Sequence, residues 1–370
     1  ASSGGDGSPA TPFHIIHEAV EKARKDKNCT TIYLREGEYI LDTPLVLTSA
    51  DGNDSKELII RNYPGEKAII SSGITLDLKW EKYKNGIMRA AVKGNPVMDM
   101  LIVNGDLRSM ARYPDYDKTA VRFNGTSALA TAPERVKKWK NPEGGYFHAM
   151  HSHDWGDFHY RITGKNEKGE LQLEGGWQNN RPMGIHPENR MVENIFEELD
   201  APGEWYYDKQ EGWLYYYPLS DENINELVFE TPQLKNLIEI AGTSSHPVKN
   251  ITIEGIELTQ TIRTFMEHYE PLLRSDWTIY RGGAVIFRGT EKCTLRDCYI
   301  HHVGGNGVFF DKYNRNSAVT GSYLTSIGAS AICFVGDVAG VRSPSFRYGE
   351  FVPLDKMDTA KGSQNDNHPA

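Results

Sequence analysis

The sequence has few cysteines, and they are not arranged as in a metal site. The four are Cys29, Cys293, Cys298 and Cys333, and the closest two are separated by four residues. Structural zinc sites built from cysteine combine two close pairs of ligands, whereas only one such pair is present here. We therefore expect no bound metal. The even number permits disulfides, and buried free thiols in a sheet core fit the sequence equally well.

The sequence also lacks a long apolar run and a basic stripe. No apolar segment approaches the ~18 residues that cross a bilayer, and the net charge of −9 is spread along the chain. These absences exclude a membrane-spanning helix and argue against nucleic acid as the main partner. Hydrophobic residues make up 39% and charged residues 25% of the 370 residues, which excludes a disordered chain. A protein with this net negative charge is better suited to an uncharged substrate than to an anionic one.

Aromatic residues, by contrast, are plentiful. They reach 11% of the chain, with 19 Tyr and 7 Trp, and many lie in polar contexts such as residues 205–207 and 215–217. Flat rings on a polar surface suit the faces of sugars. For any single tyrosine the alternative is a strand residue that packs against its cross-strand neighbours.

The first hundred residues predict a short helix followed by short strands. Thr11 and Pro12 precede apolar residues with helical spacing, which predicts a helix to about Lys27 with a Thr cap and Pro at its first position. Four β-rich pieces follow at residues 31–34, 44–48, 58–61 and 68–71, separated by Gly, Asp and Asn turns. Strands this short are stable only when stacked as coils of a solenoid, and the helix would cap its open end.

The later chain repeats at intervals of 24 residues. Positions 283, 307 and 331, within the segments GGAVIF, GNGVFF and ASAICF, are 24 residues apart, as are Ile300 and Leu324, and Gly304 and Gly328. Residues 250–258 match residues 292–300 in pattern. A coil of about 20 to 30 residues with several short strands is the signature of a parallel β-helix. The predicted fold class is therefore all-β.

Strand alternation assigns an inward and an outward face in these coils. We predict that Ala284, Ile286, Val308, Phe310, Ile332 and Phe334 point inward, and that Val285, Phe287, Phe309, Asp311, Cys333 and Val335 point outward. Asp311 beside Phe309 on an outward face is typical of a binding surface. The alternative is that another segment packs over this face and that Asp311 merely ends a strand.

Two segments interrupt the repeat. Residues 101–232 contain longer alternating strands, which predicts an antiparallel β domain inserted between coils. This divides the chain into a capping helix with the first coils (1–100), the insertion (101–232) and the later coils (233–370). Residues 259–281 form a second, highly charged interruption. Charged loops on a rigid scaffold are frequent functional sites, although surface loops are also simply charged.

Several motifs resemble those of bacterial secreted proteins with right-handed parallel β-helix repeats. The resemblance covers nearly the whole chain and is carried by DGS at 6–8, YLREGEY at 33–39, NYPGE at 62–66, ARYP at 111–114, LDAPGEWYYD at 199–208, GWLYYYP at 212–218, LRSDW at 273–277, RGGAV at 281–285 and GASAICFVGD at 328–337.

This resemblance implies a right-handed parallel β-helix of the pectate-lyase type. Its characterised members are glycoside hydrolases of the α-fucosidase and xylanase type, so a carbohydrate polymer or oligosaccharide is the implied partner, with no cofactor. It implies a secreted, periplasmic or cell-surface protein. Residues 1–8 contain no apolar signal segment, which by itself fits either a cytoplasmic protein or one whose targeting peptide has been removed. It also implies further coils beyond residue 370. Because the catalytic carboxylates of such enzymes tend to lie on late coils, two possibilities stay open: the acids are on those further coils, or among the candidates named below.

Glycoside hydrolysis needs two carboxyl groups on either side of the scissile bond. Asp311 and Asp337 lie on neighbouring coils, whose strands are about 4.8 Å apart, and Glu267 and Asp276 lie on the charged loop. A solvated or salt-bridged surface carboxylate is the alternative for each. The candidate substrate-binding residues, which would orient hydroxyls or stack on a sugar ring, are Arg274, Trp277, Arg281, Phe309, Tyr313 and Arg315.

Two other functions stay open. A polysaccharide lyase would need a base and either Ca²⁺ or a cationic clamp, for which Arg288, Lys312 and Arg315 are available, but no calcium-loop spacing is present. A non-catalytic carbohydrate-binding solenoid would need only the aromatic groove. A competent carboxyl pair in one cleft would discriminate between these functions.

The histidines of the insertion fall short of a metal site. His151 and His153 would share one face of a strand and His148 the other, with Asp154 at a turn. A polar strand edge near the substrate cleft is the better interpretation. The adjacent His301 and His302 are interpreted as turn residues.

Overall fold

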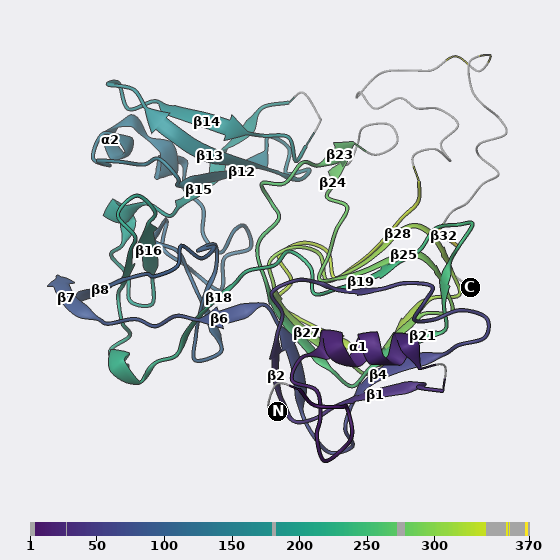
Figure 1. Ribbon diagram of the computed structural model, residues 1–370. Coiled ribbons are helices and arrows are strands. Elements are labelled where there is room, and N and C mark those ends of the chain that lie inside the picture. The colour runs from purple at the N-terminus through teal and green to yellow at the C-terminus, as the bar shows by residue number, and fades with distance from the viewer. Residues whose placement is uncertain are drawn as a thin grey trace.

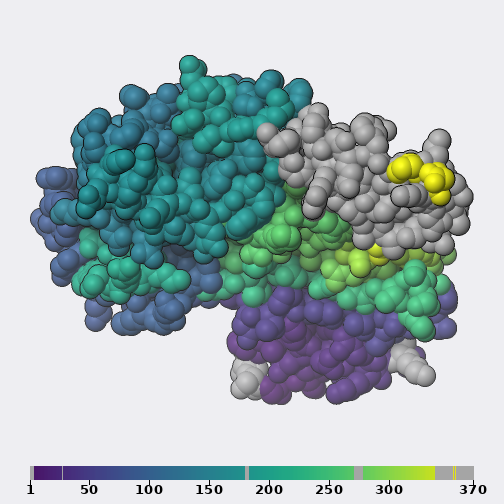
Figure 2. Space-filling model, turned by 90° about the horizontal axis from the view of Figure 1, so that it is seen from above, coloured from purple at the N-terminus to yellow at the C-terminus, as the bar shows by residue number. Residues whose placement is uncertain are grey.

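The computed structural model describes residues 4–26, 28–179, 183–271, 278–337, 353, 355 and 367–368. Strands dominate these residues and helices are few, which confirms the all-β prediction (Figure 1). Three sheets with parallel pairing, A, B and C, form one part of the molecule, and antiparallel sheets form a second. Figure 2 shows the antiparallel part, in blue and teal, as a lobe beside the purple N-terminal strands.

Each pass of the chain adds one strand to sheet A, then one to sheet B and then one to sheet C. Sheet A contains β1 (Thr31–Leu34), β4 (Leu58–Asn62), β21 (Ile251–Glu254), β26 (Thr294–Arg296) and β29 (Ala318–Thr320). Sheet B contains β2 (Gly37–Ile40), β5 (Ala68–Ser71), β22 (Glu257–Thr261), β27 (Tyr299–Val303) and β30 (Tyr323–Leu324). Sheet C contains β3 (Leu45–Leu47), β19 (Ile238–Ala241), β25 (Val285–Glu291), β28 (Val308–Arg315) and β31 (Ile332–Val335), with β20 (Val248–Lys249) beside β25 and β32 (Asn367–His368) beside β28.

The core lies between these three sheets and consists of apolar rows that continue from coil to coil. In sheet C, Leu47, Ile240, Phe287 and Phe310 follow one another in register, and all four are fully buried. No single short strand buries enough apolar surface to be stable alone, so the stacking of successive passes is what stabilises the sheets.

The 24-residue period is confirmed for the last coils but fails by one residue at β25. Val308 pairs with Ile332, 24 residues on, whereas Val285 pairs with Val308, only 23 residues on. A shift of one residue moves a side chain to the opposite face. The predicted faces were therefore wrong at β25, where Val285 and Phe287 belong to the core and Ile286 does not.

The later strands follow the predicted alternation. Val308 and Phe310 are in the core as predicted, and Phe309 lies outside that cluster. Ile332 and Phe334 continue the inward rows but are 40% and 53% exposed, because β31 is the last strand of its row among the described residues.

Left-handed backbone conformations mark the same turns in successive coils. Three columns of residues with φ between +50° and +66° recur before sheet A, between sheets A and B, and at the end of sheet B: Asn250, Lys292 and Asn316; Gly255, Asp297 and Gly321; Gln260, His302 and Ser326. Because each column repeats one conformation, successive turns superimpose and the strands that follow them stay in register.

The predicted helix is present but begins later than expected. Helix α1 (Ile16–Lys25) buries Ile16, Val20 and Ala23 against the core of the sheets. Thr11 does not cap it, because the Thr11 hydroxyl donates to Asp6 Oδ1 at 2.5 Å and thereby belongs to a separate turn. The prediction of a Thr cap and of Pro12 at the first helical position was therefore wrong.

The antiparallel part comprises three sheets and short helices. Sheet E contains β6 (Gly73–Thr75), β9 (Leu101–Val103), β10 (Asp106–Arg108) and β18 (Phe229–Pro232), and sheet F contains β7 (Glu81–Lys84), β8 (Ile87–Ala91), β16 (Trp205–Asp208) and β17 (Trp213–Tyr216). Sheet G contains β11 (Arg112–Tyr113), β12 (Tyr146–His151), β13 (Asp157–Lys165), β14 (Leu171–Gly175) and β15 (Ile185–Glu193). Beside these strands lie α2 (Pro133–Val136) and the 3₁₀ turns Ala128–Thr131, Phe196–Glu198 and Ile224–Glu226.

Antiparallel pairing begins earlier in the chain than residue 101. Strands β6, β7 and β8 precede that predicted boundary, yet β6 pairs with β18 and β8 with β17 of the insertion, and β7 extends the same sheet by pairing with β8. The change from parallel to antiparallel pairing thus occurs at Gly73. The division into three domains stays a prediction.

All four cysteines are free thiols. Cys293 and Cys298 lie in the core between the sheets, and burial raises the pKa of Cys293 to about 12 and that of Cys298 to about 11. The expectation of buried thiols in a sheet core is met at these two positions. Among the helices of the described residues, none combines the length and the apolar character needed to cross a membrane.

Candidate functional site

The outward face of sheet C carries a row of polar side chains on neighbouring strands. Asp311 on β28 pairs in register with Arg288 on β25, and Arg288 pairs with Ala241 on β19. Alternation turns these residues away from the core, because the intervening Phe287 and Phe310 fill it. The loop that leads into β25 passes over this face and contributes Arg281.

Five charged residues form one continuous network on this face. Arg281 Nη1 lies 2.6 Å from Asp311 Oδ1, and Arg288 Nε lies 2.7 Å from Asp311 Oδ2. Arg281 also binds Glu270 through Nε at 2.6 Å, and Arg288 Nη1 binds Glu239 at 2.6 Å. The order of charges is therefore Glu270, Arg281, Asp311, Arg288, Glu239, with opposite signs next to each other throughout.

Arg281 is the link between the charged loop and the sheet. Its Nη2 also donates to the carbonyl oxygen of Gly336 at 2.8 Å, so that it ties the loop to the chain just after β31. Burial alone would lower the pKa of Arg281, but the hydrogen bonds that its guanidinium donates to Glu270 and Asp311 outweigh this effect and raise the pKa. The guanidinium therefore stays charged and holds both segments in place.

Asp311 is buried beneath this network. Its side chain is 3% exposed, and each of its two carboxylate oxygens accepts a hydrogen bond from a guanidinium. In this arrangement Asp311 orients Arg281 and Arg288 rather than facing a bound molecule. Arg288, by contrast, is 38% exposed, and Glu270 is 35% exposed. The structure does not test the catalytic role predicted for Asp311, but the two guanidinium groups that occupy its carboxylate oxygens favour a positioning role over that of a reacting carboxyl.

The other predicted site residues lie at three separate places. Asp337 follows β31 and lies 3.6 Å from Lys312, whereas Glu267 binds Lys235 at 2.7 Å beside the insertion. Tyr313 and Arg315 lie further along β28, where the Tyr313 hydroxyl donates to Glu291 at 2.6 Å. Phe309 is fully buried. Arg274, Asp276 and Trp277 lie outside the described residues.

A second polar cluster joins the insertion to the parallel sheets. Arg263, in the loop after β22, binds Asp99 through Nε at 3.0 Å and through Nη2 at 2.9 Å, and its Nη1 forms an ion pair with Glu193 on β15. Glu193 Oε1 also lies 3.2 Å from His148 Nε2, and His148 Nδ1 lies 2.7 Å from His159 Nδ1. The two parts of the molecule thus share one buried chain of hydrogen bonds.

Burial sets the charges in this cluster. It lowers the pKa of His148, which favours the neutral imidazole despite the neighbouring carboxylate. Burial alone would raise the pKa of Glu193, but Arg263 and His148 reverse that effect and lower it. The cluster therefore holds an ionised Glu193 against a charged Arg263, with a neutral histidine beside them.

Sequence reasoning did not identify this cluster. The prediction of a polar strand edge was wrong, because β12, which carries His148 and His151, lies between β15 and β13 within sheet G, and both histidines are buried. Asp99 was not singled out, since its partner Arg263 is 164 residues away. Within the part of the chain that the structure describes, no three His, Cys, Asp or Glu side chains are grouped as metal ligands would be.

The fold has a counterpart among solved structures. A chain described as "Glycoside hydrolase" superposes with a TM-score of 0.70 at 20% sequence identity, over 86% of this chain. This chain spans 63% of the length of that structure. A structure described as "The complex structure of XylC with xylose" matches with a TM-score of 0.41 at 14% identity, over 83% of this chain and 40% of the other. No protein-family model and no curated protein matches the sequence.

The first of these likenesses establishes a shared fold, since 20% identity is too low to carry an activity from one chain to the other. The candidate residues for the chemistry are therefore those of the charged network on sheet C and its surroundings.

Proposed function

We propose that this protein is a glycoside hydrolase that binds a polysaccharide or complex glycan along the outward face of sheet C. The proposal includes a right-handed parallel β-helix formed by sheets A, B and C. It also includes hydrolysis by a pair of carboxyl groups without a cofactor, and a secreted, periplasmic or cell-surface location.

The observation that carries the proposal is the charged network of Glu270, Arg281, Asp311, Arg288 and Glu239. A surface formed by parallel strands and bordered by a charged loop is where binding residues tend to lie. Fixed guanidinium and carboxylate groups can donate to and accept from sugar hydroxyls without reorganising when the sugar binds. Sharing a fold with a chain described as a glycoside hydrolase supports the same assignment by analogy.

Within this proposal Asp311 is a positioning residue and the reacting carboxyls come from its surroundings. Hydrolysis needs two carboxyl groups about 5 to 5.5 Å apart for retention or about 6.5 to 9.5 Å apart for inversion. Glu267 and Asp276 on the loop and Asp337 after β31 are the proposed sources. Among the acids of the described coils, we propose that Asp337 reaches the scissile glycosidic bond. Its side chain is 27% exposed.

The lyase alternative receives less support. A lyase must neutralise the carboxylate of a uronate with Ca²⁺ or with cationic side chains. Arg281 and Arg288 are the cations of this face, and both are already paired with protein carboxylates. Lys312 is likewise beside Asp337.

The test is reducing-sugar release from a panel of neutral glycans by the wild type and by Asp337→Asn, Asp311→Asn and Asp54→Asn. We expect Asp337→Asn to abolish release, and Asp311→Asn to raise KM because Arg281 and Arg288 lose their common anchor. Asp54 is 81% exposed and pairs with Lys249 away from the network, so its variant should match the wild type. Circular dichroism of each variant controls for folding.

Three results would contradict the proposal. Unchanged release by folded Asp337→Asn would remove that residue from the reaction. Products with an unsaturated uronate would indicate a lyase. Saturable glycan binding by a wild type that releases no sugar from any substrate would indicate a binding protein.

A further inference from the structure

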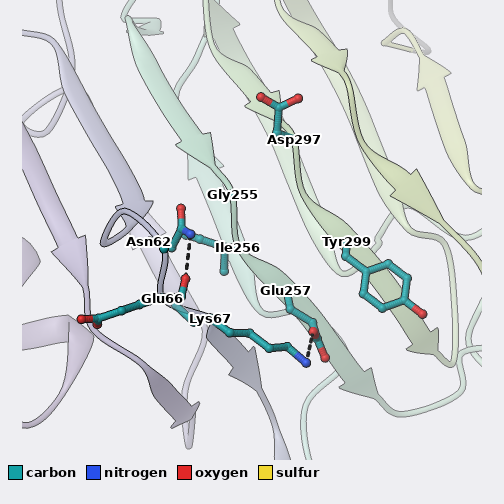
Figure 3. A pocket seen from close by; sticks show the side chains of 10 residues that line it. Asn62, Glu66, Lys67, Gly255, Ile256, Glu257, Asp297 and Tyr299 are labelled. Atoms are coloured by element: carbon teal, nitrogen blue, oxygen red, sulfur yellow. Dashed lines mark hydrogen bonds and ion pairs between the residues drawn. The ribbon is translucent and has the colours of Figure 1, made fainter.

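A shallow pocket lies at the corner between sheets A and B, and its lining residues are distinct from the network on sheet C. Its volume is about 320 Å³. Figure 3 shows Glu66 and Lys67 from the turn between β4 and β5, Glu257 and Tyr299 from β22 and β27, and Asp297 from the turn before β27. Three successive passes of the chain therefore build one pocket.

Glu257 is held rigidly within this pocket. Its Oε2 lies 2.7 Å from Lys67 Nζ, and its Oε1 lies 2.9 Å from His301 Nε2. Its side chain is 12% exposed, so that the carboxylate is fixed by partners on both sides. Burial alone would raise the pKa of Glu257, but Lys67 and His301 lower it. An ionised acceptor with a fixed position is suited to a ligand hydroxyl.

Tyr299 forms the neighbouring wall and is fixed by stacking. It pairs with Glu257 across the strands. Its ring centroid lies 4.3 Å from that of His301 and 5.6 Å from that of Tyr323, with interplanar angles of 19° and 12°. The ring is 37% exposed. Stacking on both neighbouring rings favours this position of the side chain at the pocket.

Asp297 is the carboxylate that remains open. It occupies the left-handed turn position at which the coils before and after have Gly255 and Gly321. Its carboxylate makes no hydrogen bond or ion pair with the described residues, whereas the other two acids of the pocket, Glu66 and Glu257, are paired with Arg35 and Lys67. An αL aspartate between two glycines places a charged acceptor where its neighbours place no side chain.

We propose that this pocket is a second saccharide-binding site, specific for a neutral sugar residue of the same polymer. This inference rests on the proposed function only because it assumes that the ligand is a carbohydrate. Hydroxyl groups can donate to Asp297 and Glu257 and accept from Lys67, all within one small pocket. The lining carries three carboxylates and one lysine, so a sugar with its own carboxylate would be repelled.

Because the pocket lies away from the network on sheet C, the site would bind sugar without taking part in the hydrolysis. Sheets A and B meet at this corner, whereas the charged network lies on the outward face of sheet C. A site there would hold a long chain on the protein while another part of the polymer occupies sheet C. Its loss should therefore weaken the binding of polymer and leave the turnover of short soluble substrates unchanged.

The experiment is isothermal titration calorimetry of cellohexaose, xylohexaose and trigalacturonate against the whole protein and Asp297→Asn. Asparagine tolerates the left-handed conformation, so the turn should persist. The substitution replaces a charged acceptor by a neutral one, and this weaker hydrogen bond predicts roughly a tenfold loss of affinity for the neutral probe at this site. Asp221→Asn, an exposed acid of the insertion, is the matched control and should bind as the wild type does. Reducing-sugar release is measured on the same samples.

Selective loss of neutral-sugar binding in Asp297→Asn, with sugar release from short substrates unchanged, supports the second site. The same loss in a protein that releases no sugar supports the site and rejects the hydrolase. Equal affinity of wild type and Asp297→Asn, preference for trigalacturonate, or no saturable binding of either neutral probe would overturn the inference.

Discussion

Within the insertion, Glu204 lies where a negative charge on its side chain would lower the stability of the folded protein. Glu204, in the turn before β16, is 3% exposed, and its Oε2 accepts from the backbone N–H groups of Asp200 and Ala201 at 3.4 and 3.3 Å. Its Oε1 is buried without a hydrogen-bond partner among the described residues. Burial, with a further contribution from the nearby Asp115, raises the pKa of Glu204 to about 8.

This raised pKa predicts a loss of stability on the alkaline side. Between pH values of about 4.5 and 8 the folded protein retains a proton on Glu204 that the unfolded chain has lost, so the free energy of unfolding falls as pH rises through this range. Glu204→Gln should remove that slope and be more stable than the wild type at pH 9, by about 1 to 3 kcal/mol. Urea unfolding at pH 5, 7 and 9 measures the difference.

The matched control is Glu211→Gln, which changes an exposed residue of the next turn. It should keep the slope of the wild type. A Glu204→Gln protein whose stability follows that of the wild type at all three pH values would show that Glu204 is charged in the folded state.

At the scale of elements, successive strands of sheet C are held in register by side chains that stack from one strand to the next. The rings of Phe287, Phe310 and Phe334 lie on β25, β28 and β31, with centroids 4.6 Å apart for the first pair and 4.3 Å for the second. Phe310 is fully buried in the middle of this column, whereas Phe334 is 53% exposed at its end.

Truncation of the middle ring should therefore cost more than truncation of the end ring. Phe310→Ala leaves a cavity between two rings and should lower the free energy of unfolding by about 3 to 5 kcal/mol. Phe334→Ala removes a half-exposed ring and should cost less than half of that. Urea unfolding of the two variants compares them directly, and equal losses would mean that the stack is not what joins these strands.

For the whole molecule, the decisive contact is the buried chain through Arg263. This residue joins Asp99, which precedes β9, to Glu193 on β15, and its guanidinium also lies 4.7 Å from the ring centroid of Phe265. Through Glu193 and His148 the same chain reaches the middle of sheet G. The insertion and the parallel sheets are thereby coupled.

Arg263→Met should break this coupling. It leaves Asp99 and Glu193 as largely buried carboxylates without their cation, which should cost about 3 kcal/mol or more. The insertion should also unfold in a separate, earlier transition, visible as a second calorimetric peak and as early proteolysis within residues 112–193. Arg161→Met removes an exposed pair with Glu174 at 4.0 Å and should change stability by less than about 1 kcal/mol. A single, unshifted transition in Arg263→Met would contradict the coupling.

Part of this architecture could be predicted from the sequence, because it depends on local patterns. The strands at residues 31–34, 58–61 and 68–71 and the pairing of Ile300 with Leu324 follow from alternation and from the 24-residue repeat. The one-residue shift at β25 was missed because a uniform spacing of 24 was applied, although the segments GGAVIF and GNGVFF begin only 23 residues apart, at 282 and 305. That shift alone placed Val285 and Phe287 on the wrong face.

The all-β class, the repeated short strands and their interruption by antiparallel strands could be predicted from the residues alone, because periodicity and turn residues act between near neighbours. Which charged side chains meet depends instead on how distant segments pack. Asp311 was predicted to face outward, but its burial depends on Arg281, 30 residues away, and on Arg288. The pairing of Arg263 with Asp99 spans 164 residues. Such contacts depend on how the coils and the insertion pack together, and no local pattern of residue types records that packing.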